Sequence, residues 1–154
     1  MYEQHFKTLN FLFLRLESSG IPWVLTGSFR LYLGGVNVVP HDIDIQTDQP
    51  GAYAIEDLFK DYIYEKVSWK PSSKIRSHYG KLKIHGVIVD IIGDMQKLLD
   101  DGRWEDPMDF SSHQEVLHID GMEIPVLSLA FEHMAYLKLG RIEKAAQILK
   151  VLLA

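Results

Sequence analysis

The stretch Thr26-Gly27-Ser28, followed by His41-Asp42-Ile43-Asp44-Ile45 and later by Val89-Asp90-Ile91, decides the fold of this chain. Asp42 and Asp44 alternate with two isoleucines. This is strand periodicity, so both carboxylates are expected on one face and both isoleucines on the other. Asp90 lies in a second apolar run, residues 86–92, where a buried carboxylate is costly unless its charge is compensated. A divalent cation shared by the three aspartates would compensate it, and hard oxygen ligands of this kind suit magnesium or manganese.

Length and composition set the broad class of the protein. The 154 residues favour one domain, residues 1–154, with a hydrophobic core. The net charge of -5 does not favour a broad nucleic-acid-binding surface. The absence of cysteine excludes a disulfide framework and a thiolate zinc site, and it fits a cytoplasmic location. The chain begins without signal-peptide features, and no apolar run approaches the ~18 residues that span a bilayer, so no membrane association is expected.

Hydrophobic periodicity and turn signals predict an α/β (α+β) fold, in which a small mixed sheet is packed by helices and the C-terminus is helical. Helices are expected at residues 2–18, 52–64, 128–139 and 141–153, together with a short helix that Ser28 caps and Gly34-Gly35 ends. Strands are expected at residues 22–26, 41–47, 75–85, 87–93, 115–119 and 122–126, the last two joined by an Asp120-Gly121 hairpin turn. Residues 94–112 are predicted to be irregular, with a helical turn at residues 96–99. The sheet and its helices then occupy residues 1–126, and the C-terminal helices occupy residues 127–154.

The order Gly27-Ser28, Asp42-x-Asp44 and then Asp90 resembles the nucleotidyltransferase superfamily related to DNA polymerase beta. It is most similar to small bacterial members, the minimal nucleotidyltransferases and the antibiotic adenylyltransferases. The resemblance covers the first two thirds of the chain. The tail is a weaker match, because Glu143-Lys144 replaces a Lys-Asp step that often follows the position of Arg141 in these domains.

This resemblance implies a function. A metal-dependent nucleotidyltransferase would transfer a nucleoside monophosphate, AMP from ATP, to an acceptor hydroxyl and release pyrophosphate. Asp42 and Asp44 would bind Mg²⁺ or Mn²⁺, and Asp90 would bind metal or take the proton of the acceptor. Gly27 and Ser28 would bind phosphate at a helix N-terminus. Arg30 could reach the triphosphate, although a surface charge is an equal alternative.

Other interpretations use fewer of these residues. The spacing of Asp42, Asp44 and Asp48 hints at a calcium loop, but Gln46 and Thr47 occupy positions where that loop needs other residues. No P-loop or dinucleotide-binding fingerprint is present. A glycosidase would leave Gly27-Ser28 and Asp90 unused. A different class of function stays open, a catalytically weak binding or regulatory module such as an antitoxin-like partner.

The acceptor and the assembly are not determined by the sequence. An antibiotic, a protein side chain or an RNA end all fit the chemistry, with nucleic acid not favoured by the acidic charge, and no residue pattern selects adenine. The C-terminal region is unusually apolar, and Val151, Leu152 and Leu153 are consecutive, so one helix cannot bury all three on one side. A homodimer or a helical protein partner is therefore expected, with a monomer core as the alternative.

Overall fold

The computed structural model describes all of residues 1–154. A seven-stranded mixed sheet forms the centre, in the order β3-β4-β5-β2-β1-β7-β6. The strands are β1 (Val24–Thr26), β2 (Ile43–Thr47), β3 (Ile63–Pro71), β4 (Ile75–Ile84), β5 (Val87–Lys97), β6 (Gln114–Ile119) and β7 (Met122–Leu127). The helices are α1 (Glu3–Leu16), α2 (Gly27–Leu33), α3 (Gln49–Leu58), α4 (Leu129–Lys138) and α5 (Ile142–Leu152), with short 3-10 turns at Lys60–Tyr62 and Phe110–Ser112.

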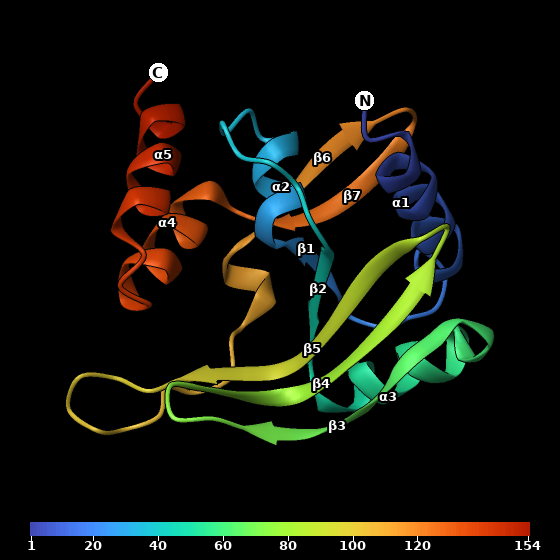
Figure 1. Cartoon of the computed structure of the whole chain (residues 1–154), viewed down its shortest axis with the longest axis horizontal. Coiled ribbons are helices and arrows are strands. Elements are labelled where there is room, and N and C mark those ends of the chain that lie inside the picture. The colour runs from blue at the N-terminus through green and yellow to red at the C-terminus, as the bar shows by residue number, and fades with distance from the viewer.

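Strand pairing confirms the mixed sheet that the sequence predicted (Figure 1). At its centre, β2 runs parallel to β5 and antiparallel to β1, and β1 runs parallel to β7. The two predicted hairpins, β4-β5 and β6-β7, form the flanks. Asp120 and Gly121 join β6 to β7 with φ angles of 49° and 81°, the positive values that a tight hairpin turn of this kind requires.

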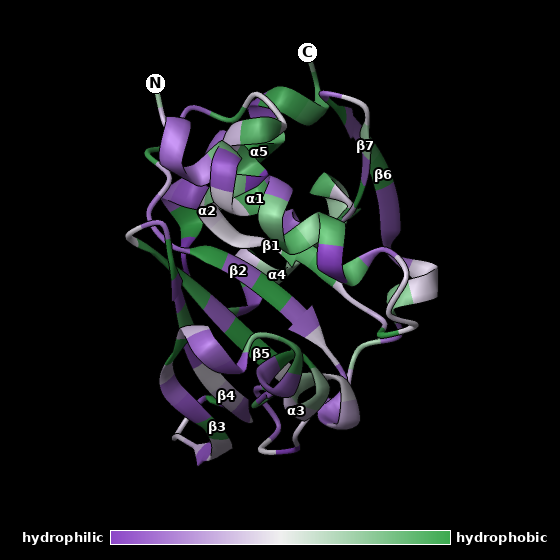
Figure 2. Ribbon diagram, turned by 90° about the vertical axis from the view of Figure 1, so that its right-hand side faces the viewer, coloured by the Kyte–Doolittle hydropathy of each residue, from purple (hydrophilic) through white to green (hydrophobic).

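The two faces of the sheet differ in character. One face packs on α1 and α3 through a core that includes Leu9, Leu12, Ile43, Ile45 and Ile55, all fully buried. Polar and apolar residues alternate along β2 in Figure 2, as expected for a strand with one face in the core. The opposite face carries the carboxylates. The C-terminal α5 lies beside α2, where Leu31, Val36 and Ile148 form a second, smaller core.

The structure differs from the prediction at residues 49–71 and at residues 96–99. Helix α3 begins at Gln49, because the Asp48 carboxylate caps it by accepting from Gly51 N, and it ends at Leu58 rather than residue 64. The following residues enter β3, an edge strand that the sequence pattern did not reveal, since its polar and charged side chains face solvent and mask strand periodicity. The predicted helical turn at residues 96–99 is instead the end of β5 and an isolated bridge.

A β-bulge interrupts β5 near Asp94. Between the His78–Gly93 pair and the Arg76–Gln96 pair, β4 advances by two positions while β5 advances by three, and Asp94 adopts a φ of 49°. The extra residue reverses the alternation of side chains along the strand. As a result Lys97, which pairs with Ile75, lies on the same face as Asp90, which pairs with Lys81.

The C-terminal helices begin as the sequence predicted. The Ser128 hydroxyl caps α4 by accepting from Phe131 N at 3.1 Å, and Gly140 separates α4 from α5. No helix of the chain has the length and apolar character that crossing a bilayer requires.

Candidate active site

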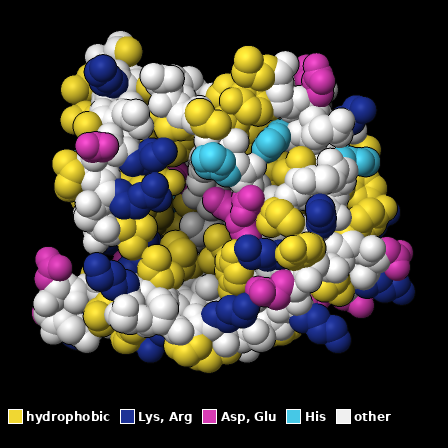
Figure 3. Space-filling model, viewed as in Figure 1, with side chains coloured by type: hydrophobic (Ala, Val, Ile, Leu, Met, Phe, Trp, Pro, Cys, Tyr) yellow, Lys and Arg dark blue, Asp and Glu magenta, His cyan; other side chains and the backbone are white.

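The three predicted carboxylates gather on the face of the sheet opposite α1 and α3. Asp44 on β2 and Asp90 on β5 are direct register partners in the parallel pair, so their side chains emerge side by side. Asp42 lies just before β2, and its carboxyl group is also within hydrogen-bonding reach of Asp90. Figure 3 shows acidic side chains clustered near the centre of this face, beside a hollow with basic side chains on its far side.

Asp90 is the most constrained of the three. It is 7% exposed, and its Oδ1 accepts a hydrogen bond of 2.6 Å from the Tyr79 hydroxyl. Burial and the Asp90 carboxylate both raise the pKa of Tyr79, so the phenol keeps its proton and acts as a donor. Lys81 Nζ lies 4.0 Å from the same Oδ1. The lysine side chain on β4 therefore faces the third carboxylate.

Like charges dominate the electrostatics of this cluster. Burial and the nearby Asp90 raise the pKa of Asp42, and they raise the pKa of Asp44 well above its usual range. Two carboxylates this close favour sharing a proton over carrying full charge together. A bound cation would therefore stabilise the ionised form of these carboxylates.

The carboxylate oxygens of this cluster are the kind of ligand that a hard divalent cation prefers. Three anionic oxygen donors converge, and Lys81, at 4.0 Å from Asp90, is the one cation that forms an ion pair with the cluster. The side chains as oriented form no group of three His, Cys, Asp or Glu residues arranged to hold a metal ion. Asp42, Asp44 and Asp90 are thus candidate ligands by chemistry and proximity.

Gly27 shapes the site because nothing larger fits beside Asp44. Thr26 is the register partner of Asp44, and Gly27 follows with a φ of 78°, a left-handed conformation. A Cβ at this position would overlap the Asp44 carboxylate and come within 2.8 Å of its Cγ. Glycine therefore lets the start of α2 approach the carboxylates directly.

The prediction that Ser28 caps α2 was wrong. The helix begins at Gly27, with Thr26 as its N-cap residue and no capping side chain. The Ser28 hydroxyl instead accepts from the backbone N–H of His41 at 3.0 Å. This contact ties the start of α2 to the segment that carries Asp42, and it leaves the hydroxyl proton of Ser28 free to donate. The His41 backbone makes a second contact, accepting from His5 at 2.6 Å.

Arg30 does not join the carboxylates. Its side chain is 1% exposed, Nε donates to the Leu127 carbonyl at 2.7 Å, and Nη2 lies 3.8 Å from Glu115. Nη1 is buried without a partner. Burial lowers the pKa of Arg30, although two glutamates oppose the shift. These contacts are those of a residue that joins α2 to β7. The role of Arg30 as a triphosphate ligand stays a prediction, and the burial of its side chain does not favour it.

Glu132 is a buried carboxylate that the sequence pattern did not reveal. It lies on α4 with 3% exposure and accepts hydrogen bonds from the Thr26 hydroxyl and the Gly27 backbone N–H. Burial raises the pKa of Glu132 to about 7, although these donors and Arg30 oppose the shift. The residue thus fastens α4 to the glycine turn. Its helical position beside apolar neighbours gave no signal of this contact.

Replacing Glu132 by glutamine is expected to reduce the pH dependence of stability. The folded-state pKa of about 7 exceeds the usual 4.5, so stability from this group is full below pH 4.5 and is lost as pH rises towards 7. A tenfold difference in proton affinity between the folded and unfolded states corresponds to about 1.4 kcal/mol of folding free energy. Urea unfolding of wild type and E132Q at several pH values between 4.5 and 8 would show a smaller decline in the variant. Equal declines would contradict the assignment.

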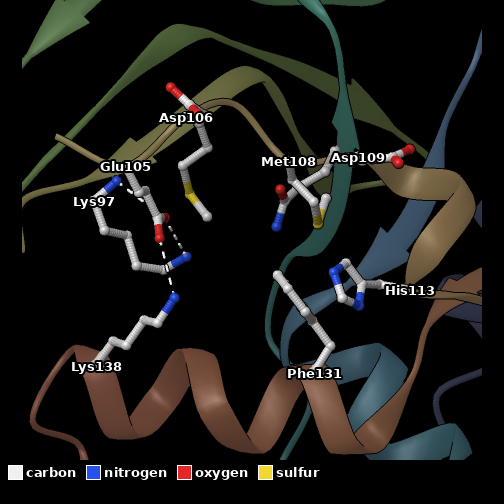
Figure 4. A pocket seen from close by; sticks show the side chains of 10 residues that line it. Lys97, Glu105, Asp106, Met108, Asp109, His113, Phe131 and Lys138 are labelled. Carbon is white, nitrogen blue, oxygen red and sulfur yellow. Dashed lines mark hydrogen bonds and ion pairs between the residues drawn. The ribbon is translucent and has the colours of Figure 1, made fainter.

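A cavity of about 170 Å³ opens beside β2, which contributes Gln46 to its lining (Figure 4). It lies between the sheet, residues 105–113 and α4. Lys97 and Lys138 both bond Glu105, each with an Nζ–oxygen distance of 3.2 Å, on one side of the cavity. His113 and Phe131 lie on the other side, with ring centroids 4.3 Å apart. Gln46, two residues beyond Asp44 on β2, also lines the cavity.

Comparison with solved structures places the fold of this chain among nucleotidyltransferases. A proposed nucleotidyltransferase from Thermotoga maritima is 46% identical, with a TM-score of 0.88, covering 99% of this chain and 94% of that one. Two enzymes share the fold at lower identity. The lincosamide adenylyltransferase LnuA, bound to lincomycin, is 18% identical with a TM-score of 0.56, covering 96% of this chain and 98% of that one. ANT(2″)-Ia, in complex with adenylyl-2″-tobramycin, is 12% identical with a TM-score of 0.59, covering 96% and 89%.

No curated protein sequence matches the chain significantly. The family described as aminoglycoside-2″-adenylyltransferase matches residues 8–148, which is most of the chain. The predicted resemblance and the predicted fold are thereby confirmed, and the chain belongs to the aminoglycoside-2″-adenylyltransferase family of nucleotidyltransferases.

Proposed function

We propose that this protein transfers AMP from ATP, with Mg²⁺ or Mn²⁺ bound, to an acceptor hydroxyl and releases pyrophosphate. The observation that carries the proposal is the direct register of Asp44 with Asp90, beside a glycine turn that opens a helix. Family membership supports nucleotidyl transfer. The antitoxin-like alternative gains no specific support from these contacts.

Asp42, Asp44 and Asp90 are the residues we propose as metal ligands. A bound divalent cation would neutralise charge that develops on the entering and leaving oxygens of the phosphoryl centre. The close approach of the three carboxylates supports this assignment, because burial and then the neighbouring Asp90 raise the pKa values of Asp42 and Asp44.

The remaining residues of the site would position the phosphates and the acceptor. Gly27 leaves room for a phosphate near the N-terminus of α2, and Ser28 has a free hydroxyl proton to donate to one of its oxygens. Asp90, on the side of the sheet away from α2, would take the proton of the acceptor hydroxyl. Tyr79 would orient Asp90 for that step by donating to one of its oxygens.

The acceptor proposed is a small hydroxyl-bearing molecule of the antibiotic class. LnuA was solved with lincomycin and ANT(2″)-Ia with adenylyl-2″-tobramycin, and both share this fold. The test is to incubate the protein with magnesium, labelled ATP and a panel of lincosamides and aminoglycosides. Acceptor-dependent pyrophosphate release supports the proposal, and ATP binding without transfer to any acceptor would favour the regulatory alternative.

Replacing Asp90 by asparagine is expected to lower the rate of transfer by roughly 10²–10⁴-fold, the usual contribution of a general base. Affinity for magnesium-ATP should fall less than in an Asp44 variant, because Asp90 lies on the acceptor side. Calorimetric titration with magnesium-ATP, paired with rate measurements, checks both parts. If D90N loses affinity as completely as D44N, Asp90 acts mainly as a metal ligand.

The assembly stays a prediction. Leu149, Leu152 and Leu153 on and after α5 are 38%, 41% and 77% exposed, which is consistent with the homodimer or helical partner expected from the sequence. We also propose that the single domain consists of a catalytic part, residues 1–126, and a helical part, residues 127–154. Light scattering over a dilution series would test the dimer.

A further inference from the structure

Glu132 is a buried carboxylate whose hydrogen-bond donors belong to the glycine turn of the candidate active site. Its side chain, on α4, is 3% exposed and accepts from the Thr26 hydroxyl and from the Gly27 backbone N–H. Thr26 is the register partner of Asp44, and a Cβ on Gly27 would overlap the Asp44 carboxylate. Glu132 therefore holds the two residues that lie next to one of the proposed metal ligands.

Packing of α4 does not by itself explain a glutamate at this position. A carboxylate loses its hydration when it is buried, and hydrogen bonds and nearby charges only partly offset that loss. An apolar side chain on α4 would be buried without this penalty. The acidic residue is better explained by the contacts that its two oxygens make with the glycine turn.

Helix α2 depends on tertiary contacts for its position. It has seven residues and no capping side chain, whereas an isolated helix needs about 12–15 residues to be stable in water. Glu132 holds its start, and Arg30 joins its middle to the end of β7 by donating to the Leu127 carbonyl at 2.7 Å. The buried guanidinium and the Glu132 carboxylate also attract each other. Loss of Glu132 would thus free the first residue of α2 to shift.

We propose that Glu132 is a positioning residue for the transfer reaction, and that it fixes the Asp44 carboxylate relative to the start of α2. The inference rests on the proposed function. Glu132 bonds the glycine turn and makes no hydrogen bond to the three aspartates, so it acts on them only through that turn. A displacement of about 1 Å at a reacting centre lowers the rate by roughly 10²-fold, so even a smaller shift of the turn is measurable.

Transfer rates, calorimetric affinity for magnesium-ATP and urea unfolding of the whole chain test the inference. Glu132→Gln keeps the shape of the side chain but replaces one acceptor by a donor. Thr26→Val removes the hydroxyl that donates to Glu132, and Thr26→Ser keeps a hydroxyl there. A double variant, Glu132→Gln with Thr26→Val, shows whether both changes act through one contact. Ser128→Ala is the matched control, because it removes the cap of α4 and leaves the turn untouched.

In the folded Glu132→Gln and Thr26→Val variants kcat should fall roughly tenfold, because alignment of the reacting groups is lost. Affinity for magnesium-ATP should fall less, since binding of the ground state does not require that alignment. The double variant should lose no more than the slower single variant, because both changes break the same contact. Thr26→Ser should keep the wild-type kcat, and Ser128→Ala should lose stability but not kcat.

Two kinds of result would overturn the inference and leave the proposed function standing. One is a wild-type kcat in Glu132→Gln and Thr26→Val, or losses that multiply in the double variant. The other is an equal loss of kcat in Ser128→Ala, which would show that any loosening of α4 slows transfer. A wild-type protein that transfers AMP to no acceptor overturns both the inference and the proposed function.

Discussion

Replacing Asp44 by asparagine is expected to reduce nucleotidyl transfer by at least about 10²–10³-fold, the scale of losing one preorganised electrostatic contact at a transition state. Asparagine keeps the size of the side chain but removes the negative charge that a divalent cation requires. The measurement is acceptor-dependent pyrophosphate release with saturating magnesium-ATP, together with calorimetric affinity for magnesium-ATP.

The same variant is also expected to change thermal stability. Burial and the neighbouring Asp90 both raise the pKa of Asp44, so removal of this negative charge relieves desolvation and repulsion without metal. D44N should therefore melt at the same temperature as wild type or higher when magnesium is absent. Asp57→Asn, at an exposed position on α3, removes an equal charge and should change neither property. Normal turnover in D44N would remove Asp44 from the proposed metal site.

The central strands and their carboxylates could be predicted from the sequence because the signals are local. Alternation of Asp42 and Asp44 with isoleucine marks β2, and the apolar run around Asp90 marks β5. The hairpin turns were equally local, since Asp120-Gly121 and His85-Gly86 suit the positive φ angles found there. Such local patterns can be recognised in the sequence without knowledge of the tertiary structure.

Other parts of the site depend on contacts between distant residues. Arg30 follows the glycine turn, yet the Leu127 carbonyl, 97 positions later in the chain, determines where its guanidinium lies. Glu132 meets Thr26 and Gly27 across the fold, and no local pattern marks that contact. The bulge at Asp94 brings Lys97 onto the face of Asp90, which strict alternation would have excluded.

The position of one residue that lines the cavity, Gln46, could be predicted from the sequence. Gln46 follows Asp44 by two positions on a predicted strand, so alternation alone places both side chains on one face. What the sequence could not supply was the wall opposite it, which α4 and residues 105–113 build from a different part of the chain.

Replacing Gly27 by alanine is expected to lower both stability and transfer, and the effect on transfer should be the larger. A left-handed backbone conformation costs a residue with a Cβ about 1–2 kcal/mol. In addition, the new methyl group would overlap the Asp44 carboxylate, so the carboxylate or the turn must move. Activity should fall by roughly 10²-fold, because displacements of about 1 Å at a reacting centre cost that much.

Gly20→Ala separates the two contributions. Gly20 has a φ of 77°, nearly that of Gly27, but a Cβ there meets no atom within 4 Å. Its loss of stability in urea unfolding therefore measures the backbone cost alone, and its transfer rate should equal that of wild type. If both alanine variants lose the same stability and keep the same activity, the close approach of Gly27 to Asp44 has no part in catalysis. A rate loss confined to G27A ties the glycine turn to the position of the Asp44 carboxylate.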